Sequence, residues 1–310
     1  MANNFAVTDK VASVAAASLG ASLVLGRTVF RDVEKEFEGG YGDTIRIRVP
    51  KAIPAKPFIE GTTTITDIVQ TVNEGTVPLK LNTHAVSAVS LSPKDYSLNV
   101  FSTQAQAVIP TSQGVAEYIE NAIATERLNP KIAAADALVI DPVNVRDAIL
   151  DAGVKLDKAK VPGTRWLAVS PDVKKLLLAD PMLAAVNSSG GDDALADAVI
   201  GRLHGFNVVV SPYLDAGAVA YSQDAFAVAI RAPYAPPGSN GASAEFSDST
   251  STVGYALTVL QAFHDDTLTQ RIIAEAFVGT AEIDPARSVG LKLPSGAFSA
   301  GTMSAKASKK

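Results

Sequence analysis

The sequence is marked first by the residue types that it lacks. It contains no cysteine, which excludes disulfide bonds, cysteine-ligated zinc and thiol catalysis. It has only 3 histidines, and of these only His264, which Asp265 and Asp266 follow, has acidic neighbours. We interpret this tripeptide as a solvated turn between two strands, because a metal site needs further ligands that converge on it. No metal or cofactor is therefore expected.

The motifs of catalysis and nucleotide binding are also missing. No Gly-x-Ser-x-Gly nucleophile elbow is present. The glycine-rich stretch at Gly39–Gly42 lacks the Lys-Ser/Thr pair of a phosphate loop and precedes a strand rather than a helix. The carboxylates of Asp192–Asp193 are adjacent, so in a strand they point to opposite faces. We expect no catalytic residues and no enzyme, and an α/β enzyme built on the middle of the chain is the competing hypothesis.

Charge and aromatic residues are scarce as well. Charged residues make up 19% of the chain and aromatic residues 6%, and the formal net charge is −5. A nucleic-acid-binding protein would show a basic footprint, so we expect no specific binding to nucleic acid. The uncharged stretch Val11–Gly26 has 16 residues, fewer than the roughly 20 that a membrane-spanning helix needs. We expect an amphipathic N-terminal helix there, with Thr8 as its N-cap and Gly20 or Gly26 as its end, and no association with membranes.

Residues 39–91 form an excursion that looks like an arm rather than a core. Thr44–Val49 alternates apolar and basic side chains, which is the period of a half-buried strand. A two-stranded ribbon of this length is at best marginally stable alone in water. The ribbon must therefore lie on another surface, and we predict that a partner subunit provides it. The predicted inter-subunit arm consists of Thr44, Ile45, Arg46, Ile47, Arg48 and Val49.

A long helix is predicted after the arm. It opens at Pro110, and Asn129–Pro130 is expected to end it, because the residue before a proline disfavours the helical region. Its apolar positions recur on one face, and the opposite face is expected to carry Glu117, Glu120 and Arg127.

From Ala137 onwards, short strands alternate with helices, and two longer strands, Val253–Phe263 and Arg271–Val278, follow. Within the alternating region, Gly201 and Gly205 bracket a turn before the strand that starts at Phe206. Glycine there either provides a backbone conformation that other residues avoid, or allows a close approach to a symmetry axis. We predict Gly201 and Gly205 as a turn important for folding or for assembly.

Several segments resemble one protein family. The segment Ile200–Pro212, Ile-Gly-Arg-Leu-His-Gly-Phe-Asn-Val-Val-Val-Ser-Pro, is similar to a segment of the major capsid proteins of tailed bacteriophages, which have the Hong Kong 97-type fold. Gly42–Pro50, Ser170–Val173 and Asp224–Ala229 resemble other parts of that fold, in the same order.

The resemblance implies an α+β fold of five parts. They are an N-terminal arm (1–38), an extended β-hairpin loop (39–91), a peripheral domain with a long spine helix (92–134 and 253–295), an axial α/β domain (135–252) and a flexible tail (296–310).

The implied function is structural. A major capsid protein self-assembles through pentamers and hexamers into the icosahedral shell that encloses the double-stranded DNA genome, here without specific DNA binding. The expected partners are further copies of the chain, a portal, and scaffolding and decoration proteins. The expected location is the virion capsid, assembled in the host cytoplasm. The alternative is an encapsulin-like shell protein of a bacterial nanocompartment, which has the same fold.

Overall fold

The computed structural model describes residues 7–31, 44–49, 53–58, 60, 64–70, 75–92, 107–180, 201–235, 240–246, 255–264 and 266–294. The chain divides into two compact units, and each contains two separate segments of sequence. The first unit comprises residues 1–120 and 224–285, and the second comprises residues 121–223 and 286–310. Helices and β-sheets occur in both units, so the predicted α+β class is confirmed.

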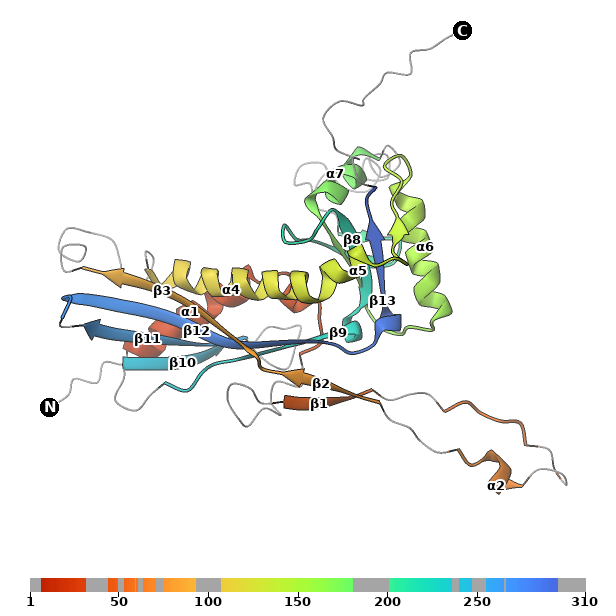
Figure 1. Cartoon of the computed structure of the whole chain (residues 1–310), viewed down its shortest axis with the longest axis horizontal. Helices are drawn as coiled ribbons and strands as arrows, with labels where there is room; N and C mark the ends of the chain where they lie inside the picture. Colours follow the sequence, from red (N-terminus) through yellow and green to blue (C-terminus); the bar gives the residue numbers. More distant parts are fainter. Residues whose placement is uncertain are drawn as a thin grey trace, which may run out of the picture. The chain divides into compact units, whose positions relative to one another are not determined.

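The first unit is built on an antiparallel sheet of five strands (Figure 1). The strand order is β10 (Asn240–Phe246), β11 (Tyr255–His264), β12 (Thr269–Glu282) and β3 (Thr83–Leu91), and β9 (Phe226–Arg231) also pairs with β12. The 14 residues of β12 allow it to pair with β11 and β3 and, towards its C-terminal end, with β9. This strand therefore organises the whole sheet.

Helix α1 (Val7–Ser22) packs on β10 and β11 of this sheet. Its buried side chains include Val11, Ala12, Ala15, Ala16 and Leu19, a spacing that forms one helical face. The predicted amphipathic helix is therefore present. It begins one residue before the expected N-cap, Thr8, and ends between the two expected stops, Gly20 and Gly26. Within the described part of the chain, no helix combines the length and the apolar character needed to cross a membrane.

The long helix differs from its prediction at its C-terminal end. Helix α4 (Ile109–Ile123) leads into a π-helical turn, η4 (Ala124–Leu128), and then into α5 (Asn129–Ala133). Asn129–Pro130 therefore does not end the helix. Proline lacks a backbone N–H and disrupts the regular α-helical pattern, and here the wider turn directly precedes it, with the Asn129 N–H bonded to the Ala124 carbonyl.

The second unit contains a mixed sheet of six strands. The order is β4 (Leu138–Val139), β13 (Ser288–Lys292), β8 (Gly217–Ser222), β5 (Arg165–Val169), β7 (Phe206–Val210) and β6 (Arg202–Leu203). Helices α6 (Val145–Lys158) and α7 (Pro171–Ala179) share an apolar core with the sheet, which includes Ile149, Leu167 and Phe206. The short 3-10 turns η5 (Gln223–Ala225) and η6 (Pro285–Arg287) lie where the chain passes between the units.

Strand pairing explains why the compact units differ from the expected domains. Strands β9 and β10 fall within the residues expected for the axial domain, but they pair with β12 and β11 of the first unit. Strand β13 falls within the expected peripheral segment, but it pairs with β8 and β4 of the second unit. The five-part domain organisation stays a prediction, and its tail, residues 296–310, lies outside the described residues.

Candidate functional site

The predicted arm is a two-stranded ribbon of β1 (Thr44–Val49) and β2 (Gly75–Lys80). The predicted alternation is confirmed, since Arg46 and Arg48 are exposed while Ile47 is only 7% exposed. Ile47 belongs to an apolar cluster that also contains Leu79, Leu81, Ala227, Ala229 and Ala281. The expectation that the ribbon has no core within its own subunit is therefore wrong, because β9 and the end of β12 supply one.

Beyond the ribbon, the described residues of the loop expose large apolar side chains. Ile53 and Phe58 are each 55% exposed, and Ile65 and Val69, in and after the short helix α2 (Ile65–Ile68), are 74% and 71% exposed. A hydrogen bond of 2.8 Å from Gln70 Nε2 to the Pro54 carbonyl joins the two sides of the loop. A contiguous patch of exposed apolar side chains marks an interaction surface, and these four residues are the candidates for one in the loop. The inter-subunit role of Thr44–Val49 itself stays a prediction.

Gly205 belongs to a tight β-hairpin. His204 and Gly205 connect β6 to β7, with Leu203 paired to Phe206, and both turn residues have positive φ, 47° and 84°. Two central residues with positive φ define the turn whose twist suits a two-residue hairpin. Gly201 does not have a positive φ, and a Cβ atom added there would meet no other atom within 4 Å. The structure therefore provides a backbone reason for glycine at position 205, while a role in assembly stays a prediction for both glycines.

Helix α4 carries a buried carboxylate that was not predicted from the sequence. Glu120 was expected to face away from the core, but its side chain is only 3% exposed. It accepts hydrogen bonds from three successive backbone N–H groups, those of Val24 at 2.8 Å, Leu25 at 2.9 Å and Gly26 at 3.1 Å. These residues follow α1 and include the start of the 3-10 turn η1 (Leu25–Arg27). The carboxylate thus fixes the end of the N-terminal helix to α4.

The surroundings of Glu120 act on its pKa in opposite directions. Burial raises its pKa above the usual 4.5, while the three backbone N–H groups and the positive charge of Arg27 act to lower it. The chain then continues to Phe30, whose N–H and carbonyl bond to β9, each at 3.0 Å. Arg31 stacks on the ring of Tyr255, with 3.9 Å between the guanidinium carbon and the ring centre. Successive contacts therefore hold the N-terminal segment on the first unit.

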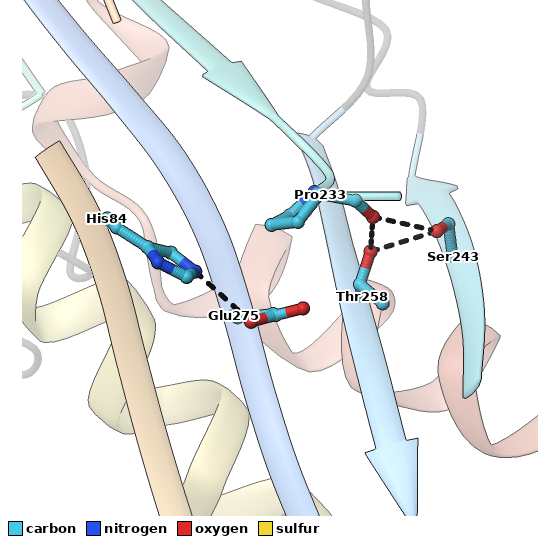
Figure 2. Close-up of polar contacts among 5 residues, drawn as sticks. All are labelled: His84, Pro233, Ser243, Thr258 and Glu275. Carbon is cyan, nitrogen blue, oxygen red and sulfur yellow. Dashed lines mark hydrogen bonds and ion pairs between the residues drawn. The ribbon is translucent and has the colours of Figure 1, made fainter. Parts of the chain in front are cut away.

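Polar contacts also join the strands of the first unit (Figure 2). His84 on β3 and Glu275 on β12 lie 3.1 Å apart, from Nε2 to Oε2, on neighbouring strands. The Thr258 hydroxyl donates to the Pro233 carbonyl and contacts the Ser243 hydroxyl at 2.8 Å. The first contact joins β3 to β12, and the contacts of Thr258 join β11 to β10 and to the segment that follows β9. Among the described residues, no group of three histidine or acidic side chains is arranged to hold a metal.

The sequence and the fold were compared with known proteins. A family model described as phage capsid protein matches residues 94–286. Comparison with curated protein sequences finds no significant match.

Solved structures with a similar fold include a protein of Mycobacterium phage Che8, with 18% identity, a TM-score of 0.60 and coverage of 87% of this chain and 90% of that one. The capsid of the cyanophage P-SCSP1u has 12% identity, a TM-score of 0.60 and 88% coverage of both chains. A virus-like particle from Pyrococcus furiosus has 11% identity, a TM-score of 0.52 and coverage of 93% of this chain and 100% of that one. The chain therefore belongs to the phage capsid protein family and has the Hong Kong 97-type fold of tailed-phage major capsid proteins.

Proposed function

We propose that this protein is the subunit of an icosahedral phage shell, which it builds through pentamers and hexamers around a double-stranded DNA genome. The observation that carries the proposal is the match of the phage capsid family over residues 94–286. The exposed apolar loop supports it, because a shell would cover such side chains in every copy. Heterologous contacts between identical copies close into rings when the rotation between them closes, which is how capsomers arise.

The proposal extends to location and partners. The shell subunit would assemble in the host cytoplasm and reside in the virion, with a portal at one vertex and with scaffolding or decoration proteins as further partners. The genome would be enclosed without sequence-specific contacts, since the chain carries a net charge of −5 and no broad basic footprint is apparent in its composition.

Negative-stain electron microscopy of the purified protein tests the proposal. We expect closed polyhedral particles or ring-shaped capsomers of uniform size. A protein that stays monomeric at high concentration, with and without the products of neighbouring structural genes, would refute it.

The similarity to the Pyrococcus furiosus virus-like particle keeps a nanocompartment shell as the second candidate. Analysis of particles purified from the native source separates the two. Protected double-stranded DNA of uniform length supports the phage shell, whereas particles filled with a protein cargo and free of DNA would favour the nanocompartment.

A further inference from the structure

One face of the β1–β2 ribbon is basic along its whole length. Strand pairing places Thr44 opposite Lys80, Arg46 opposite Pro78 and Arg48 opposite Thr76, and all six side chains are exposed. Three of the six are cations and none is an acid. We call Arg46, Arg48 and Lys80 the basic face.

The basic face is held in place but has no partner within the described chain. The opposite face of the ribbon packs on the first unit through Ile47 and Leu79, so the strand alternation holds the three cations on the outside. None of the three forms an ion pair among the described residues. Like charges at such spacing repel one another. The protein has a net charge of −5, so a second copy carries an excess of acidic residues that can neutralise the three cations.

We propose that the basic face docks on carboxylates of a second copy of this chain, an inference that rests on the proposed shell function. Charge complementarity supports this partner. The chain has 32 acidic and 27 basic residues. Exposed acids that form no ion pair with another described residue occur on its surface, such as Glu117 on α4 and Asp151 on α6. Opposite charges at the rim of an interface select the partner and fix the register of docking.

Continuity with the apolar loop supports the same partner. The ribbon leads into the segment that exposes Ile53 and Phe58, so one neighbour could cover both the apolar side chains and the basic face. Nucleic acid is a poorer fit. Three cations would release few counterions on binding phosphates, and nucleic-acid-binding domains show a broader basic patch.

Charge reversal tests the proposal on the full-length chain. In the Arg46→Glu/Arg48→Glu variant, two attractions become repulsions, and we expect the critical concentration for particle formation to rise about tenfold or more. The Arg46→Lys/Arg48→Lys variant keeps both charges and should assemble nearly normally. A Lys158→Glu/Lys160→Glu variant, altered at exposed positions on the second unit, controls for the same change in net charge. Hydrogen exchange of Ile47 and Leu79 in unassembled subunits shows whether the ribbon stays folded.

Zero-length carbodiimide cross-linking identifies the partner. Particles assembled from isotopically light and heavy copies should give light–heavy cross-links between the Lys80 amine and a carboxylate. Cross-links confined to one copy, or an unchanged critical concentration in the charge-reversal variant, would overturn the inference while leaving the shell function intact. A salt-sensitive gel shift with duplex DNA that the same variant abolishes would assign the face to nucleic acid instead. Failure of the unaltered chain to form particles would refute the shell function, and this inference with it.

Discussion

Removal of the Glu120 carboxylate should detach the N-terminal segment from α4. In a Glu120→Ala variant, the N–H groups of Leu25 and Gly26 stay buried without an acceptor, and each such loss costs about 1–3 kcal/mol. The Val24 N–H lies nearer the surface, so water can replace its lost bond. Loss of the buried charge offsets part of the cost. We therefore expect the free energy of unfolding to fall by about 2–4 kcal/mol.

Hydrogen exchange and chemical denaturation of unassembled subunits measure this effect. Amide protection of Val24–Gly26 should fall strongly, and the denaturation midpoint of the first unit should decrease. Glu117→Ala is the matched control, because Glu117 lies on the same helix but is exposed, and its loss should change stability by less than about 0.5 kcal/mol. Equal behaviour of the two variants would refute the role assigned to the Glu120 carboxylate.

The pH dependence of this contribution has a definite sign. Because burial raises the pKa of Glu120 above 4.5 in the folded state, the folded chain binds this proton more tightly than the unfolded chain does. The corresponding stabilisation is fully present below the unfolded pKa and is lost as the pH rises through the folded pKa. A Glu120→Gln variant does not titrate at this position. The stability of the unaltered protein relative to this variant should therefore decrease as the pH rises above 4.5, and an increase would contradict the assignment.

Two further predictions concern glycines in the second unit. A Cβ atom at Gly290 would lie 1.9 Å from the Lys131 carbonyl oxygen of α5, so Gly290→Ala should cost about 3 kcal/mol or more, whereas Gly201→Ala, with nothing within 4 Å, should change the denaturation midpoint little. Gly205→Val should cost about 1 kcal/mol or more through its positive φ alone, and a variant of normal stability that fails to form particles would instead support a contact near a symmetry axis.

The sequence pattern predicted local features better than long-range ones. Alternation in Thr44–Val49 correctly indicated a half-buried strand, because a period of two residues depends only on the strand itself. The pairing of β13 with β8, by contrast, joins residues that are distant in the sequence and has no local signal.

Glu120 illustrates a second limit. On a helical wheel, Glu120 lies between the buried Ala116 and the exposed Glu117. Its position at the border of the apolar face could therefore be predicted from the sequence. The three backbone N–H groups that make burial of the charge tolerable come from a turn 94 to 96 residues earlier in the chain. Only the fold brings this turn to the helix, so residue type and spacing alone could not reveal it.

At the base of the ribbon, the backbones of two strands approach each other closely. Strand β2 continues into Leu81 directly over Gly279 of β12, where a Cβ atom would lie 2.4 Å from the Lys80 carbonyl oxygen. The apolar cluster that the ribbon shares with β9 and β12 contains the small residues Ala227, Ala229 and Ala281, and Phe277 of β12 packs against it. Small side chains let the backbones approach closely, and larger ones would lift the ribbon away from the sheet. The path of the ribbon over β9 and β12 therefore depends on residues of minimal size at Gly279, Ala227 and Ala229.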